Sequence, residues 1–182
     1  MILPGIFASQ MSGHLSNYVS LQTVTVGSGG ASSVVFSSIP SGYTHLQLRY
    51  LARNSAAQTV NDLNIFLNSD TTTTGYNQHR MYGNGSGVTS QFNTATGIGF
   101  LSGNSTTSTV FCVGVVDFLD YTNTNKYKTI RSISGFEDNA SGYGAIYSVL
   151  RQDTTPISTI TLKDNGGTNL AQYSSFALYG VK

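Results

Sequence analysis

The carboxylates are the first residues of this sequence to consider for chemistry. A glycosidase needs two of them on either side of one pocket, and Asp117 and Asp120 form the nearest tempting pair. Because they stand three positions apart at the end of an apolar segment, their side chains would point to opposite faces of a strand. The spacing therefore favours a strand end followed by a polar turn over an acid–base pair.

Glu137 and Asp138 are adjacent rather than facing, and Asn139 and Gly142 follow them closely. This composition predicts a solvated loop. A calcium site in the loop stays open as an alternative, because oxygen ligands are present although the spaced motif of a calcium loop is not.

Histidine and cysteine offer no further chemistry. The spacing of His14, His45 and His79 gives no HxH or HExxH pattern to place two imidazoles on one metal ion, so we expect surface or loop positions. Cys112 lies in an apolar segment without a nearby histidine, which favours an inert buried side chain over a nucleophile. As the only cysteine, it also excludes an internal disulfide.

Two glycine-rich segments, 27–30 and 83–87, resemble phosphate-binding loops only superficially. Neither is followed by a Lys-Ser/Thr pair or by a helix start, so both are expected to be hairpin turns. The sequence therefore predicts no catalytic, metal-binding or cofactor-binding residue, and we expect a protein that is not an enzyme.

Composition narrows the possible partners. Nine Lys and Arg against eight Asp and Glu leave a net charge of +1, which argues against bulk nucleic-acid binding. No apolar stretch approaches the ~20 residues of a membrane span, and the first ten residues contain no Lys or Arg, so we expect neither membrane insertion nor a secretion signal. The 11 Tyr and 9 Phe supply enough burial for a folded chain.

The elements that would position these residues are strands. Short β-branched or aromatic segments separated by Gly, Ser, Asn and Pro recur, and residues 45–52 and 62–68 alternate between apolar and polar side chains. Residues 18–26 are expected to form a hairpin with 32–37, and 110–119, apolar on both faces, a central strand covered on both sides. With about nine or ten strands, the expected fold is all-β, an antiparallel β-sandwich of the jelly-roll type.

One domain over 16–182 is expected, preceded by a short N-terminal arm over 1–15. The apolar residues of the arm lack strand alternation and are interrupted by a Pro-Gly pair, which favours docking on a partner chain over a place in the domain's own core. A frayed terminus is the alternative. The predicted docking residues are Ile2, Leu3, Ile6 and Phe7.

Three stretches of sequence carry a resemblance: TVTVGSGGASSVVFSSIPSGYTHLQLR (23–49), DYTNTNKYKTIRSISG (120–135) and AQYSSFALYGVK (171–182). They are similar to a family of small tailed-bacteriophage and prophage proteins, which often open with a stretch like GIFASQMSGHL (5–15). The resemblance leaves 54–109 uncovered. It implies a virion structural protein and no catalytic residues.

Within the virion, a capsid cement or decoration protein is expected first, because the chain is short and lacks a long fibrous segment. Its expected partners are the major capsid protein and itself as a homotrimer, with no nucleic acid, membrane or cofactor. The first alternative is a tail fibre or baseplate receptor-binding module that binds a host glycan. A polysaccharide depolymerase is the third reading.

Overall fold

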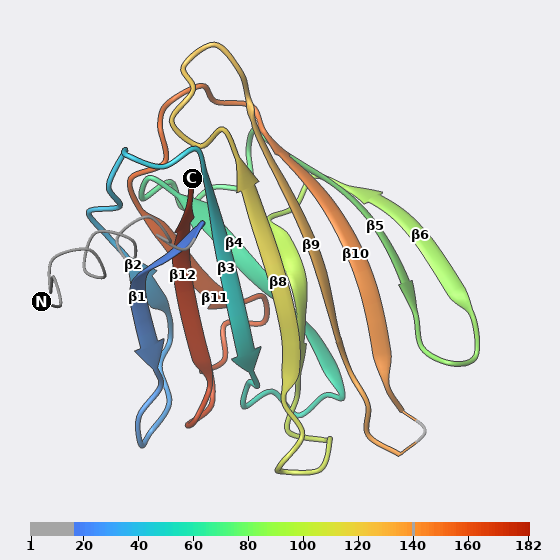
Figure 1. Ribbon diagram of the computed structural model, residues 1–182. Coiled ribbons are helices and arrows are strands. Elements are labelled where there is room, and N and C mark those ends of the chain that lie inside the picture. The colour runs from blue at the N-terminus through green and yellow to red at the C-terminus, as the bar shows by residue number, and fades with distance from the viewer. Residues whose placement is uncertain (1–16, 140) are drawn as a thin grey trace, which may run out of the picture.

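The computed structural model describes residues 17–139 and 141–182, which contain twelve strands and no helix (Figure 1). Eight of the strands form one sheet and four form another. The larger sheet contains β1 (Tyr18–Thr25), β3 (His45–Ala52), β5 (Tyr76–Gly83), β6 (Val88–Asn93), β8 (Cys112–Leu119), β9 (Lys128–Phe136), β10 (Tyr143–Arg151) and β12 (Ser175–Val181). The smaller sheet contains β2 (Val34–Phe36), β4 (Val60–Leu67), β7 (Gly97–Ser102) and β11 (Ile160–Asp164).

The strand order is β1-β12-β3-β8-β9-β10-β5-β6 in the larger sheet and β2-β11-β4-β7 in the smaller one. Every pairing between these strands is antiparallel. The sheets pack face to face around one hydrophobic core. The predicted all-β, antiparallel β-sandwich is therefore confirmed. Among the fully buried side chains of the hydrophobic core are Phe36, Leu46, Leu48, Leu63, Ile65, Ile98, Phe118 and Phe176.

Alternation in the sequence located β3 and β4 well. The predicted segment 45–52 matches β3, and its inward side chains Leu46, Leu48 and Tyr50 are buried. β4 buries alternate side chains in the same way. In contrast, β6 was not predicted, because this edge strand has no buried residue and thus no alternating apolar face.

The predicted hairpin between 18–26 and 32–37 is wrong. β1 pairs with β12 and β2 pairs with β11, so the two segments belong to different sheets. The glycine-rich turn between them carries the chain from one layer to the other. Gly29 and Gly30 have φ angles of +91° and +76°, which a residue with a Cβ atom rarely adopts.

β8 is central in its sheet, between β3 and β9, as predicted. The prediction that it is covered on both sides is wrong for the described residues, because among them only the face toward the smaller sheet is buried. Val113, on the other face, is 54% exposed. Apolar side chains on both faces of a strand therefore do not by themselves show that both faces are covered within the chain.

β7 is an edge strand of the smaller sheet, yet every one of its residues is buried. Side chains of the larger sheet satisfy its free backbone groups. The Tyr50 hydroxyl donates to the Phe100 carbonyl at 3.0 Å, and the Phe100 N–H donates to Ser134 Oγ at 3.1 Å. The Ser132 hydroxyl donates to the Ile98 carbonyl. These hydrogen bonds join β7 to β3 and β9, and β7 also packs on β8 and β10.

The predicted docking residues Ile2, Leu3, Ile6 and Phe7 lie outside the described residues. No helix in the part of the chain that the structure describes is long and apolar enough to cross a membrane.

Candidate functional site

The outer face of the larger sheet, which the smaller sheet does not cover, carries a row of apolar side chains. The strand register places Val115, Ile133, Ile146 and Met81 next to one another across β8, β9, β10 and β5. Ile133 is 60% exposed, Ile146 53% and Met81 50%. We call these four residues the apolar row.

A second line of neighbours runs beside the apolar row and contains glycines. Gly135 and Gly144 pair with each other, and Gly144 also pairs with Gly83. Val113 and Val88 stand at the two ends of this line. Because glycine has no side chain, the face is hollowed here, in two shallow apolar depressions of about 310 and 520 Å³.

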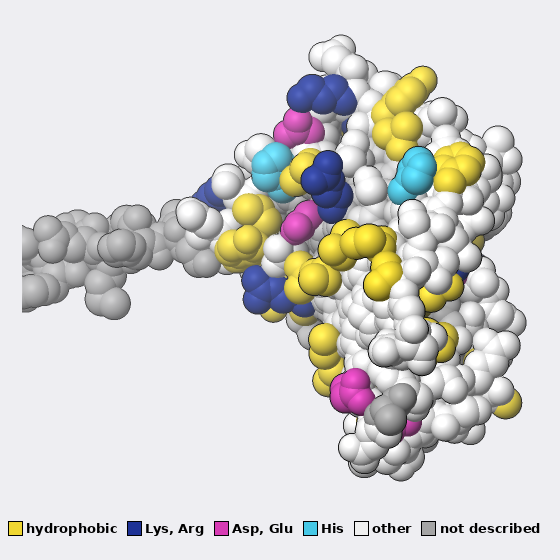
Figure 2. All heavy atoms as spheres, turned by 90° about the vertical axis from the view of Figure 1, so that its right-hand side faces the viewer, with side chains coloured by type: hydrophobic (Ala, Val, Ile, Leu, Met, Phe, Trp, Pro, Cys, Tyr) yellow, Lys and Arg dark blue, Asp and Glu magenta, His cyan; other side chains and the backbone are white. Residues whose placement is uncertain are grey.

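The face thus offers an apolar surface with shallow hollows, beside the charged side chains of Arg49, Asp117 and Arg131. Figure 2 looks at the molecule from the β5–β6 side and shows apolar side chains gathered near the middle of this view, beside histidine, basic and acidic side chains. An antiparallel sheet that faces water on one side normally carries polar side chains there. A contiguous apolar patch of this kind is typical of a contact surface for another protein.

A polar line borders the apolar row on its other side. Gln47, Asp117 and Arg131 are register neighbours in β3, β8 and β9. Gln47 Nε2 donates to Asp117 Oδ1 at 2.8 Å, and Arg49 Nε donates to Gln47 Oε1 at 2.8 Å. These bonds hold the polar side chains in place along the edge of the apolar row.

The structure does not bring Asp117 and Asp120 together as an acid–base pair. Asp117 is hydrogen-bonded to Gln47 within the sheet, whereas Asp120 follows β8 at a positive φ of 48°. Asp120 binds Lys126 Nζ at 2.8 Å and lies 3.6 Å from His45 Nδ1. The hydrogen bond from Lys126, with its charge, lowers the pKa of the Asp120 carboxyl, so this carboxylate is part of a surface ion pair.

The other residues that the sequence offered as candidates for chemistry also lie apart from one another. The Asp138 carboxylate accepts a hydrogen bond from the Thr107 backbone at 3.1 Å. His45 lies in β3, and His79 packs on Phe92 with ring centroids 4.9 Å apart. Over residues 17–139 and 141–182, no group of three or more His, Cys, Asp or Glu side chains is placed to hold a metal ion.

Cys112 is fully buried at the start of β8. Burial raises the pKa of its thiol to about 12, so the thiolate form is rare at neutral pH. The predicted core position of this residue is confirmed.

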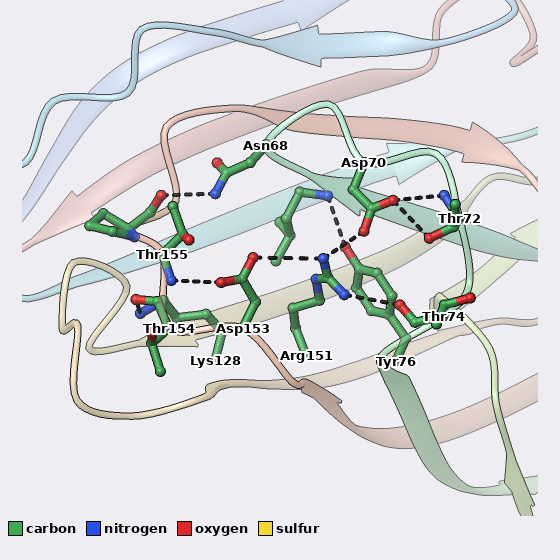
Figure 3. A network of polar contacts seen from close by, with 12 residues as sticks. Asn68, Asp70, Thr72, Thr74, Tyr76, Lys128, Arg151, Asp153, Thr154 and Thr155 are labelled. Carbon is green, nitrogen blue, oxygen red and sulfur yellow. Dashed lines mark hydrogen bonds and ion pairs between the residues drawn. The ribbon is translucent and has the colours of Figure 1, made fainter.

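Residues close to one end of the sandwich form a polar network around Arg151 (Figure 3). Arg151 Nη2 lies 2.6 Å from Asp70 and 3.6 Å from Asp153, and Nη1 donates to the Thr74 carbonyl at 2.9 Å. The guanidinium also covers the Tyr76 ring at 4.7 Å. This network ties the loop after β4 to the loop after β10.

Lys128 belongs to the same region and is 1% exposed. Its ammonium donates to the carbonyls of Asn123 and Thr154. Burial lowers the pKa of this amine. With both bonds directed at loop backbone, Lys128 anchors the loops at this end of the sandwich.

The sequence did not reveal one cluster of polar and aromatic side chains. Asp62 of β4 and Arg80 of β5 form an ion pair across the two sheets at 2.8 Å, in a cleft that also contains Tyr82 and Tyr143. Because β4 and β5 belong to different sheets, no strand pairing joins Asp62 to Arg80, and only the packing of the two sheets brings them together. Arg80 is in phase with the buried residues of β5, but Asp62 is out of phase with the buried residues of β4, which has a register shift between Leu63 and Asn64. Alternation in the sequence therefore does not point to this pair.

The fold and these surfaces define an all-β sandwich with an exposed apolar sheet face. Comparison of the chain with protein-family models, with curated proteins and with solved structures gives no match.

Proposed function

We propose that the protein is a structural protein of a bacteriophage virion, a capsid cement or decoration protein that binds the major capsid protein and stabilises the head shell. The three phage-like stretches of sequence support this setting. The apolar row supports a contact with another protein, and it is the observation that carries the proposal. Such a role requires no turnover of a substrate.

The proposed stabilisation of the shell depends on repetition of one contact over many subunits. A shell repeats the same subunit seam many times, so a weak apolar contact is multiplied by the number of bound copies. Binding to the assembled shell in preference to its separated subunits stabilises the shell by mass action. The apolar row and its glycine depressions provide a surface for such a contact, and the polar line beside them provides a border.

We also assign the sandwich to the jelly-roll type. β1, β12, β3 and β8 are neighbours in the larger sheet, and β2, β11, β4 and β7 make up the smaller one. The chain therefore changes sheet at each step from β1 to β5, from β6 to β8, and from β10 to β12. This alternation between two four-stranded layers is typical of a jelly roll. The β5–β6 and β9–β10 hairpins then extend only the larger layer.

A receptor-binding module at the tail is the second candidate. The observation that favours it is the cleft of Asp62 and Arg80, because polar and aromatic side chains converge there. Labelling the protein on intact particles separates the two proposals, since decoration requires label on the head shell and receptor binding requires it at the tail tip.

The test of decoration is the stability of particles assembled with and without the protein. The expected result is a higher temperature of head disruption with the protein, rising with occupancy. The double variant Ile133→Ser/Ile146→Ser should bind shells less and lose this effect, because it removes the centre of the apolar row.

Val35→Ser is the matched control, since Val35 is 44% exposed but belongs to β2 in the other sheet. Equal head stability with and without the protein, together with loss of host adsorption when the protein is absent, would favour the tail module. Equal stability and equal adsorption would contradict both.

A further inference from the structure

A cleft of about 300 Å³ opens where the larger sheet extends beyond the smaller one. β7 is the last strand of the smaller sheet on this side and packs on β8, β9 and β10. The β5–β6 hairpin projects past it, at the right of Figure 1. The inward side chains at the start of β5, Tyr76 and Gln78, are buried, whereas Arg80 and Tyr82 farther along the strand line the cleft.

The base of the cleft is an ion pair held from several sides. Arg80 Nη1 lies 2.8 Å from both carboxylate oxygens of Asp62, and Arg80 Nε donates to Gln91 Oε1 at 2.8 Å. The Tyr147 hydroxyl donates to Asp62 Oδ1 at 3.1 Å. Burial raises the pKa of Tyr147 far above its usual range, so this donor stays protonated.

The ion pair leaves the cleft without net charge. The side chains of Arg80 and Asp62 are 15% and 23% exposed, and each neutralises the other at contact distance. The Arg80 guanidinium interacts with Gln91 Oε1, both Asp62 oxygens and the Tyr147 hydroxyl, and its five N–H groups outnumber these four acceptors. The cleft therefore retains a fixed N–H donor in neutral surroundings.

Aromatic rings form the walls. Tyr82 and Tyr143 each pack edge-on against Phe100, with centroids 5.7 Å apart in both pairs. The guanidinium carbon of Arg80 lies 5.2 Å from the centre of the Tyr82 ring. Within the described residues, neither tyrosine hydroxyl is hydrogen-bonded, so both remain available to a ligand.

The rim adds polar groups that are already oriented. Asn84 Oδ1 accepts hydrogen bonds from the N–H groups of Ser86 and Gly87, both at 3.1 Å, which fixes the amide plane. Its Nδ2 and the hydroxyl of Thr89 make no hydrogen bond inside 17–139 and 141–182. They add further hydrogen-bonding groups beside the tyrosines.

We propose that this cleft binds a neutral saccharide of one or two rings. Sugars present apolar C–H faces that pack on tyrosine rings, and hydroxyls that pair with amide, hydroxyl and guanidinium groups. The volume is at the lower end for small-molecule sites. An anionic ligand is disfavoured, because the charge of Arg80 is already compensated by Asp62.

The site is one of binding and not of hydrolysis. Among the described residues, Asp62 is the one carboxylate that lines the cleft, and it is bound by Arg80 and Tyr147. A glycosidase requires a second carboxylate on the other side of the bond to be cleaved. The proposal is independent of whether the protein resides on the head or the tail of a particle.

The test is titration of the isolated protein with neutral sugars, namely glucose, galactose, N-acetylglucosamine, lactose, maltose and chitobiose, followed by ligand-observed NMR and calorimetry. At least one should bind. The double variant Tyr82→Phe/Tyr143→Phe keeps the ring packing and should weaken binding at least about tenfold by removing two hydroxyls. Tyr82→Ala should weaken it further.

Tyr127→Ala is the control, because Tyr127 is 52% exposed and lies outside the cleft. Melting temperatures of all variants show whether each one folds. No binding up to about 20 mM of any neutral sugar, binding of sialyllactose or glucose 1-phosphate alone, or binding unchanged in both cleft variants would each overturn the proposal. These results leave the decoration test untouched, because that test measures particle stability.

Discussion

Tyr50 occupies a space that two glycines leave open between the sheets. A Cβ atom at Gly114 of β8 would collide with the Tyr50 ring, and one at Gly99 of β7 would collide with its hydroxyl. The close packing of the two layers here therefore depends on the absence of two side chains.

We predict that Gly114→Ala lowers the free energy of unfolding by about 1–3 kcal/mol, the usual cost of overpacking. Gly144→Ala is the matched control, because a Cβ atom at this strand position of the same sheet meets nothing within 4 Å. Urea denaturation of the two variants measures the difference. Equal stability would show that Tyr50 can move without cost.

The position of Cys112 gives a second prediction at this scale. Because the thiol is buried and its pKa is raised to about 12, a thiol reagent should modify the native protein slowly and the urea-denatured protein at once. Absorbance of the released reagent measures both rates. Rapid modification of the native protein would contradict the position of β8 in the core.

At the scale of elements, β7 shows how side chains can replace a missing strand neighbour. We predict that Ser132→Ala/Ser134→Ala destabilises the protein by about 1–3 kcal/mol for each backbone group left buried without a partner. Ser148→Ala, on the exposed face of β10, should change stability little. Thermal melting tests the pair, and equal melting temperatures would show that water satisfies the edge of β7.

The loop network around Arg151 predicts acid sensitivity. The backbone N–H of Thr72 and that of Thr155 are the main cause of the lowered pKa values of Asp70 and Asp153, respectively. A carboxyl whose pKa is lower in the folded state stabilises the fold above its unfolded pKa, and this contribution is lost as the pH falls through the folded value.

The melting temperature should therefore fall as the pH drops below about 4. Asp70→Asn/Asp153→Asn should be less stable at pH 7 and show a smaller drop over the acid range. Asp138→Asn, outside the network, controls for the loss of a carboxylate. If Asp70→Asn/Asp153→Asn and Asp138→Asn show the same dependence of melting temperature on pH, the acid-sensitive groups lie elsewhere.

At the scale of the whole molecule, the N-terminal arm and the oligomeric state remain predictions. Deletion of residues 1–15 should reduce association of the protein with particles, because Ile2, Leu3, Ile6 and Phe7 would be lost as docking residues. Sedimentation of particles with the truncated and full chains measures this. Equal association would indicate a terminus without a docking role.

The proposed homotrimer is tested by light scattering of the isolated protein and by imaging of decorated particles. Threefold clusters of density on the shell are expected even where the free protein is a monomer, because the shell can supply the symmetry. A twofold or solitary arrangement on the particle would contradict the trimer.

The amino-acid sequence by itself determined the class of the fold and the strands whose two faces differ. Alternating side chains at 45–52 and 62–68 specify which face is buried, since the side-chain period of a strand is two residues. The burial of Cys112 follows in the same way from the apolar segment around it.

Only the tertiary structure decided which strands are neighbours. From the sequence alone, the segments 18–26 and 32–37 fit a hairpin. Only their pairing with β12 and β11, respectively, shows that they belong to different sheets. The apolar row and the Asp62–Arg80 cleft arise in the same way, from register across four strands and from contact between two layers. Local patterning acts over a few residues of one strand, whereas the contacts that make these surfaces join residues far apart in the chain, so their geometry depends on the packing of the whole sandwich.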